Sequence, residues 1–272
     1  MKNLAVAGLV LLFVASSGAM AYVVTLDADR DSELCNTDSN KGLGGKYYCP
    51  ANVLMSWDLS GVTLGPGEYV ASGKLTLFNS TGGPSNYNYD VVAYPLVKTW
   101  GEGIGIPVDG YGGEGWPWGP VSVGDSTYTY QIVSQVVADP NYQFVASAGT
   151  PWAGLGATGA ADSDQTRPLV QSNLAGGPVS GAGASLGSLP LTAAGCGVVE
   201  DWINLGLANN GVVMIFTDLG GSVLHLGTRE TAGAPPGPGV AAAELELTIV
   251  PEPASMLLLL GGIAAVVRRR KR

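Results

Sequence analysis

The sequence is poor in charge, and its basic side chains are concentrated at the two ends. Charged residues make up 13% of the 272 residues. Of the 13 Lys and Arg, Lys2 stands near the start, and five form the C-terminus: Arg268, Arg269, Arg270, Lys271 and Arg272. The stretch from Tyr22 to Val250 holds seven cations against 21 acids, a formal charge of −14. Because so acidic a body repels phosphate backbones, nucleic-acid binding is excluded.

Histidine is nearly absent, which limits the catalytic chemistry. His225 is the only histidine, and the alternation of Val223–Leu226 places it opposite Leu224 and Leu226, on the outer face of a strand. One histidine among scattered serines disfavours a Ser-His-Asp hydrolase. The three cysteines have no spacing that suits a zinc site.

The N-terminus has the pattern of a secretory signal peptide. Lys2 precedes an apolar run, Leu4–Val14, that only Gly8 interrupts, and Ala19-Met20-Ala21 forms a small-x-small cleavage site. The run is short for a membrane anchor. We therefore predict that Met1–Ala21 is removed and that the mature chain begins at Tyr22 in an oxidising compartment.

The C-terminus combines a short motif, an apolar stretch and the basic cluster. Pro251, Glu252 and Pro253 precede Met256–Val267. As a helix these twelve residues would extend about 18 Å, against a hydrocarbon core of about 30 Å, so they make a marginal span that snorkelling arginines would help. The positive-inside rule places the basic cluster in the cytoplasm and the body outside the inner membrane.

This C-terminal segment, Pro251–Arg272, resembles the PEP-CTERM sorting signal of Gram-negative bacteria. The resemblance implies recognition by an exosortase, a membrane protease-transpeptidase, at or near Pro251, Glu252 and Pro253. It also implies export to the cell surface or extracellular matrix in bacteria that make exopolysaccharide. An ordinary stop-transfer tail is the weaker alternative.

The body, Tyr22–Val250, has the composition and patterning of an all-β domain. Its 41 Gly and 17 Pro disfavour a helical bundle. Short alternating runs separated by turn residues favour an antiparallel β-sandwich or jelly roll, flanked by the signal helix and a short transmembrane helix. The predicted strands are Tyr22–Leu26, Val53–Leu59, Glu68–Asn79, Tyr87–Val97, Thr127–Ile132, Gly211–Thr217, Ser222–Leu226 and Ala242–Val250.

A few segments of the body are not predicted to be strands. Apolar spacing predicts short helices around Thr129–Val137 and Val198–Leu207. Gly101–Gly124 and Ala146–Gly197 are rich in small residues and are expected to form long loops.

Several segments of the body, taken in order along the chain, share the pattern of one family of modules. They are Val53–Ser60, Val70–Leu77, Val91–Gly103, Trp118 with Trp152 and Gly154, Val199–Val213 and Leu226–Glu230. These segments resemble DNRLRE-type domains, which are extracellular, disaggregatase-related β-sandwich modules that overlap a carbohydrate-binding family. The DNRLRE string itself is absent, and Asn52 and Trp57 replace a usual Arg and Phe, so the resemblance implies the fold more safely than the ligand.

In an exported chain, cysteines are expected to pair. Thirteen residues separate Cys35 from Cys49, and a disulfide between them is favoured over a bridge from either one to Cys196. Cys196 is then left as a buried or a reactive thiol.

Aromatic residues in Gly-rich loops are the best candidates for a ligand site. Flat rings stack on the apolar faces of sugars, so they predict glycan binding, with packing in the core as the alternative. Trp116 and Trp118 are the strongest candidates, followed by Trp100, Trp152 and Tyr111. The predicted function is therefore a non-enzymatic surface or matrix protein that binds extracellular polysaccharide or is purely structural.

Acidic residues supply two less favoured hypotheses. A secreted polysaccharide-active hydrolase or lyase would need two facing carboxylates, recruited from Glu102, Glu114, Glu200 and Asp201. No cofactor is predicted. Alternation would line up Asp27, Asp29, Asp31 and Glu33 on one edge of a strand, where they are candidates for calcium, although solvated surface acids are favoured.

Overall fold

The computed structural model describes residues 20–34, 46–49, 52–79, 85–102, 121–139, 143–179, 181, 183–219, 224–227 and 243–252. The described chain is mostly strand, which confirms the all-β prediction. The elements are β1 (Tyr22–Leu34), β2 (Lys46–Cys49), β3 (Asn52–Trp57), β4 (Glu68–Phe78), β5 (Ser85–Pro95), β6 (Tyr130–Asp139), β7 (Gln143–Pro151), η1 (Leu155–Ala157), β8 (Val170–Val179), β9 (Ser185–Pro190), α2 (Ala193–Ile203), β10 (Val212–Asp218), β11 (Leu224–Gly227) and β12 (Glu244–Pro251).

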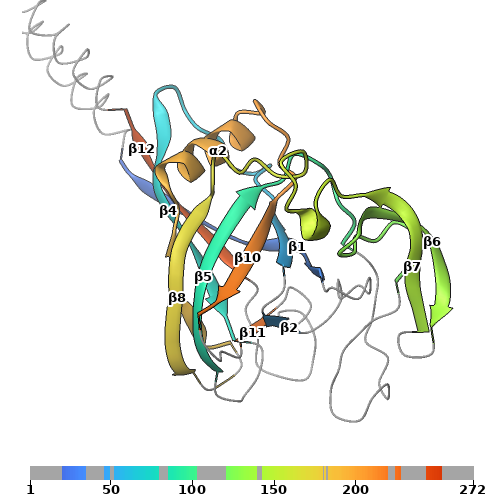
Figure 1. Ribbon diagram of the computed structural model, residues 1–272. Coiled ribbons are helices and arrows are strands. Elements are labelled where there is room, and N and C mark those ends of the chain that lie inside the picture. The colour runs from blue at the N-terminus through green and yellow to red at the C-terminus, as the bar shows by residue number, and fades with distance from the viewer. Residues whose placement is uncertain are drawn as a thin grey trace, which may run out of the picture.

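Eight strands form one antiparallel sheet in the order β8-β5-β10-β3-β1-β12-β4-β9 (Figure 1). The first half of β1 pairs with β12, and its second half pairs with β3. A bulge between Ala28 and Arg30 separates the two halves, so β1 turns a corner between two layers. At the opposite side, an isolated bridge joins Val170 to Leu191 and brings the two outer strands together. The layers of the predicted sandwich are thus two parts of one nearly closed sheet.

The space inside the sheet is filled by apolar side chains from both layers. Leu75 and Leu77 of β4 and Leu245 and Leu247 of β12 are buried in one cluster, as their alternation predicts. Val198, Val199 and Trp202 of α2 join this cluster, and Figure 1 shows α2 at the upper end of the sheet. One end of the core is therefore closed by a helix.

The predicted helix Val198–Leu207 exists but is displaced toward the N-terminus. Thr192 caps α2, because its side-chain oxygen accepts a hydrogen bond from the Gly195 N–H at 2.8 Å. The helix ends at Ile203, and Leu205 takes a left-handed φ of 58°. The Thr192 cap therefore sets the start of the helix, and the left-handed Leu205 marks its end.

A second, smaller cluster covers the outer face of β3 and β10. Leu54 and Val213 point away from the inner core and pack with Trp100, Trp152 and Ala157. The cover comes from η1 and the loops that lead into and out of the β6–β7 hairpin (Figure 1). This outer layer makes the fold more than a simple two-layer sandwich.

Two predictions for the middle of the chain are wrong. The expected helix Thr129–Val137 is part of β6, because its branched residues pair with β7. The expected loop Ala146–Gly197 contains most of β7, all of β8 and β9 and the start of α2, and its small residues allow close strand contacts. At Gly176, for example, an added Cβ would lie 2.6 Å from the Tyr87 hydroxyl oxygen.

Both targeting segments fall largely outside the described residues. The described part of the chain contains no helix long and apolar enough to cross a membrane. The predicted signal helix up to Ala19 and the predicted span Met256–Val267 lie outside that part. They stay predictions from sequence.

Candidate functional site

A groove of about 770 Å³ opens where the bulge of β1, the end of β3 and the loop after α2 meet. Trp57 and Trp202 contribute to its lining, yet both side chains are almost fully buried, so they form its floor. Its other lining residues are Asp29, Arg30, Ser56, Asp58, Leu59, Ser60, Val62, Thr63, Ile203, Leu205, Leu207, Ala208 and Asn209. The groove therefore combines an apolar floor with walls of mixed apolar and polar side chains.

A second hollow of about 310 Å³ lies beside the groove and shares Trp202, Leu207 and Ala208 with it. Its other walls come from the end of β5 and from Asp164 and Arg167. The loop after α2 thus borders both hollows.

A chain of hydrogen bonds fixes the polar wall at the β1 bulge. The Ser56 hydroxyl donates to Asp29 Oδ1 at 2.6 Å and accepts from Arg30 Nε at 3.1 Å. The Arg30 guanidinium lies 4.9 Å from the ring centroid of Trp100 and donates to its carbonyl oxygen at 3.4 Å. The wall thus presents a carboxylate, a hydroxyl and a guanidinium in set positions.

The turn into β10, which lines the groove through Asn209, is fixed by two asparagines. Asn209 Nδ2 donates to the Trp57 carbonyl oxygen at 2.7 Å, and its Oδ1 accepts from the Gly211 N–H at 3.1 Å. Asn210 lies next to it and accepts, through its carbonyl oxygen, the indole N–H of Trp100 at 2.8 Å. The turn into β10 is therefore tied to β3 and to the outer cluster.

The helix end at the groove carries an exposed leucine in an unfavourable backbone conformation. Gly206 N donates to Asp201 O at 2.8 Å and Leu205 N to Trp202 O at 3.2 Å, the pattern of a Schellman cap. Glycine is preferred where this cap needs a positive φ, but the position is taken by Leu205, which is 88% exposed. Backbone strain held at a surface groove suggests a functional role.

Replacing Leu205 with glycine should stabilise the fold. The side chain is exposed, so its loss removes little packing, while glycine relieves the left-handed strain. We expect Leu205→Gly to raise the free energy of unfolding by about 1 kcal/mol in chemical denaturation. Leu219→Gly is the matched control, because Leu219 is also exposed but has no positive φ. A Leu205→Gly protein no more stable than wild type would contradict this assignment.

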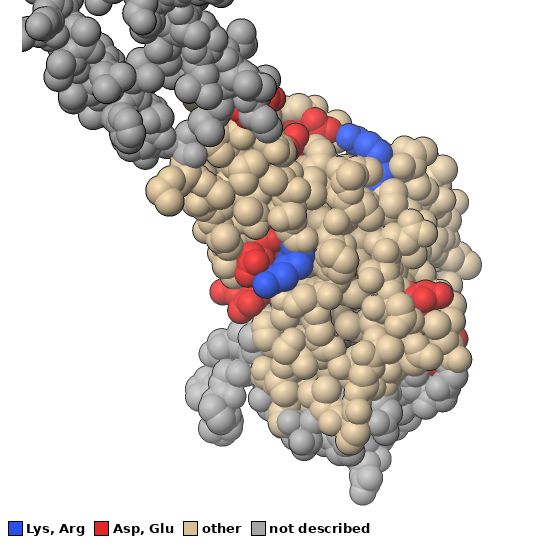
Figure 2. All heavy atoms as spheres, turned by 90° about the vertical axis from the view of Figure 1, so that its left-hand side faces the viewer, with Lys and Arg blue, Asp and Glu red and all other residues tan. Residues whose placement is uncertain are grey.

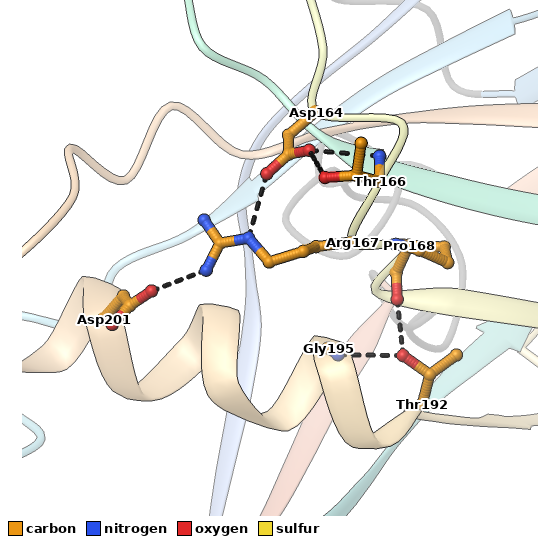
Figure 3. A network of polar contacts seen from close by, with 7 residues as sticks. All are labelled: Asp164, Thr166, Arg167, Pro168, Thr192, Gly195 and Asp201. Atoms are coloured by element: carbon orange, nitrogen blue, oxygen red, sulfur yellow. Dashed lines mark hydrogen bonds and ion pairs between the residues drawn. The ribbon is translucent and has the colours of Figure 1, made fainter.

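An ion network fixes α2, and with it Trp202, against the loop that precedes β8 (Figure 3). Arg167 Nε lies 2.9 Å from Asp164 Oδ2, and its Nη1 lies 2.7 Å from Asp201 Oδ2. Hydrogen bonds from the Thr166 hydroxyl and from Arg167 hold the pKa of Asp164 below its usual value. At the other end of α2, the Thr192 hydroxyl donates to the Pro168 carbonyl oxygen. Together these contacts hold α2, and with it Trp202, in place.

The described tryptophans that sequence analysis proposed for glycan stacking are packed in the outer cluster. Trp100 and Trp152 are 3% and 5% exposed, and the Trp152 indole donates to the Thr127 carbonyl oxygen at 2.9 Å. Rings whose faces are covered cannot stack on a sugar. Tyr111, Trp116 and Trp118 lie outside the described residues, so stacking there stays a prediction.

The candidate catalytic carboxylates bind different parts of the fold. Glu102 accepts a hydrogen bond from the Asp31 N–H at 3.1 Å, Glu200 from the Val70 N–H at 2.6 Å, and Asp201 is paired with Arg167. None of the three lines either hollow, and Glu114 lies outside the described residues.

The acids of β1 do not share one edge, because the bulge reverses the alternation. Asp27 is exposed before it, and Asp31 is fully buried after it. Across the described ranges, no three His, Cys, Asp or Glu side chains are grouped as metal ligands would be.

The cysteine predictions are tested only in part. Cys35 and the side chain of Cys49 lie outside the described residues. Cys196 is buried, and burial together with the charge of Glu200 raises the pKa of its thiol. A raised pKa favours the buried, unreactive alternative.

The groove is not predicted from the sequence, because the groove depends on a bulge and a helix end that bring distant segments together. The only local signal was the polar Trp57–Ser60 turn followed much later by Asn209-Asn210-Gly211.

Comparison with known families gives one match, at the end of the chain. Residues 250–272 match the PEP-CTERM protein-sorting motif, which confirms the prediction from Pro251, Glu252 and Pro253. The motif indicates exosortase-dependent export and sorting to the cell surface. No curated protein and no solved structure matches the chain, so the DNRLRE-type resemblance of the body has no support from these comparisons.

Proposed function

We propose that this exported surface protein binds extracellular polysaccharide in the groove between the β1 bulge and the end of α2. The observation that carries the proposal is the composition of the groove, in which apolar side chains stand beside polar groups held in place by hydrogen bonds. Sugars offer apolar C–H faces and hydroxyl groups, and such a surface suits both. Sorting to the cell surface agrees with this role, since a protein at the surface meets the cell's own polysaccharide.

Charge favours a neutral polysaccharide over an anionic one. The body carries −14 between Tyr22 and Val250, so it repels uronic acids and sulfated sugars. Figure 2 shows a face of the domain on which most side chains are uncharged. Hydroxyl groups, rather than charges, are then the groups to be recognised.

A binding role suits the groove better than catalysis. A general acid in a glycosidase needs a raised pKa. Asp58, a carboxylate that lines the groove, has the opposite shift, because hydrogen bonds from Ser60 lower the pKa of its carboxyl. Stacking on Tyr111, Trp116 and Trp118 is a separate proposal, which rests on their place in a Gly-rich stretch of the sequence.

Leu205→Gly and Ser60→Trp test the groove. A sugar that covers Leu205 loses a contact worth about 1.4 kcal/mol, so Leu205→Gly should bind the producing strain's purified polysaccharide about tenfold more weakly. Because this variant is expected to be more stable than wild type, unfolding cannot explain the loss. Ser60→Trp should obstruct the groove and abolish binding. The control Leu219→Gly lies outside both hollows and should bind as wild type does.

The measurement is the dissociation constant by titration calorimetry for all four proteins. Equal affinity in wild type, Leu205→Gly and Ser60→Trp would remove the groove from the binding site. Binding lost only in Trp116→Ala or Trp118→Ala would move the site to the loop.

A further inference from the structure

The sorting motif begins inside the folded domain. β12 extends to Pro251, which pairs with Glu68 of β4. The next residue, Glu252, donates its backbone N–H to the carbonyl oxygen of Gly67. The matched motif starts at residue 250, so its first three residues are paired with or bonded to the rest of the fold.

The turn that receives these residues is rigid. Glu68 N donates to Gly65 O at 3.0 Å, Pro66 occupies the second position, and Gly67 has a φ of 75°, which together define a type II turn. The Glu68 carboxylate also accepts hydrogen bonds from the Gly65 N–H at 2.8 Å and from the Tyr22 hydroxyl at 3.2 Å. The Gly67 carbonyl is therefore held in place for Glu252.

β12 is also an interior strand of the sheet. It pairs with β1 on one side and with β4 on the other, and Ile249 is fully buried. A peptide enters an extended cleft of an enzyme through free backbone N–H and C=O groups. In Glu252 the fold has already engaged the backbone N–H, and Pro251 has no backbone N–H to offer.

We propose that the Gly65–Glu68 turn restrains the first residues of the sorting motif, so that exosortase gains access only when the end of β12 opens. The proposal rests on exosortase-dependent sorting, and it adds that the folded domain sets the rate. Only Pro253, Ala254 and Ser255 separate Glu252 from the apolar stretch. The chain therefore has no long linker there that could present the motif to exosortase while the end of β12 stays paired. A correctly folded domain then leaves the membrane slowly, at a rate set by the local stability of one strand end.

Two variants of the full chain test this restraint in cells that contain the cognate exosortase. A Gly-Ser-Gly-Ser insertion between Val250 and Pro251 moves the intact motif away from the turn. Gly67→Ala disfavours the left-handed φ that the turn needs. Gly61→Ala is the matched control, because an added Cβ there meets no atom within 4 Å.

Pulse–chase labelling measures the half-time of the precursor. We expect the insertion to shorten it at least fivefold and Gly67→Ala about fivefold, since weakening the turn raises the open fraction by that factor. Gly61→Ala should match wild type. An insertion variant processed at the wild-type rate would overturn the proposal.

Hydrogen exchange of the Glu252 amide separates this proposal from sorting itself. In the full chain held in detergent, restraint by Gly67 predicts exchange at least tenfold slower than for an unstructured amide, and wild-type protection is lost in the insertion variant. Exchange at the unstructured rate in wild type would refute the restraint, whatever the processing assay gives. A protected amide in a chain that is never processed would instead contradict exosortase-dependent sorting.

Discussion

Asp162→Ala is expected to lower the free energy of unfolding by about 3 kcal/mol. The Asp162 carboxylate is fully buried and binds Lys98 Nζ at 2.7 Å. It also accepts the backbone N–H groups of Ala153 at 2.9 Å and Gly154 at 2.8 Å. Alanine would leave these partners without an acceptor and weaken the attachment of the loop that carries η1 to Lys98, in the segment after β5. Chemical denaturation of wild type and variant measures the difference.

Ser163→Ala provides the control for this change. Ser163 is as buried as Asp162, but within the described residues its hydroxyl has no hydrogen-bond partner. Its removal should alter the stability by less than about 0.5 kcal/mol. Similar losses for both variants would mean that burial alone, and not the carboxylate, stabilises this loop.

The same carboxylate predicts loss of stability in acid. Burial raises the pKa of Asp162, but hydrogen bonds from Ala153, Lys98 and Gly154 outweigh it and hold the pKa below the usual value. Because the folded-state pKa is depressed, the contribution is complete above the unfolded value of about 3.9 and is lost as the pH falls through the folded value. Asp162→Asn keeps the shape of the side chain but cannot titrate. The free energy of unfolding of this variant should therefore fall less steeply at low pH than that of wild type.

The sequence predicts β12 well because one face of this strand is buried throughout. In β12, Leu245, Leu247 and Ile249 alternate with Glu244, Glu246 and Thr248, and burial follows this pattern. The polarity of each residue decides which face of the strand it takes, so the alternation in the sequence is enough to predict the strand. The sorting motif is likewise a local string, and its match confirms what Pro251, Glu252 and Pro253 indicate.

The sequence does not predict elements that depend on distant partners. β8 contains Gly176, Gly177 and Pro178, which have poor strand propensity, and it forms because β5 offers a paired strand with a large Tyr87 above Gly176. The bulge in β1 likewise reverses which acids face inward, so alternation alone misplaces Asp31. The groove arises from these non-local features, which is why sequence analysis assigned ligand binding to loop tryptophans instead.

Trp100→Ala should be the most destabilising substitution in the outer cluster, with a loss of about 4 kcal/mol. The indole is 3% exposed, it donates to the Asn210 carbonyl oxygen, and the Arg30 guanidinium lies over its ring. Alanine would remove the packing, the hydrogen bond and the cation–π contact together. The loss is measured by chemical denaturation.

Trp100→Phe separates the two roles assigned to this residue. Phenylalanine keeps a ring beneath Arg30 but cannot donate to Asn210, so we expect a loss of about 1.5 kcal/mol in stability. Because the ring of Trp100 is covered, polysaccharide affinity should change by less than twofold. A sugar-stacking role would give the opposite pattern, with affinity reduced by the smaller ring and stability nearly unchanged. Stability and affinity measured on this one variant therefore decide whether Trp100 supports the groove wall from behind or contacts the ligand.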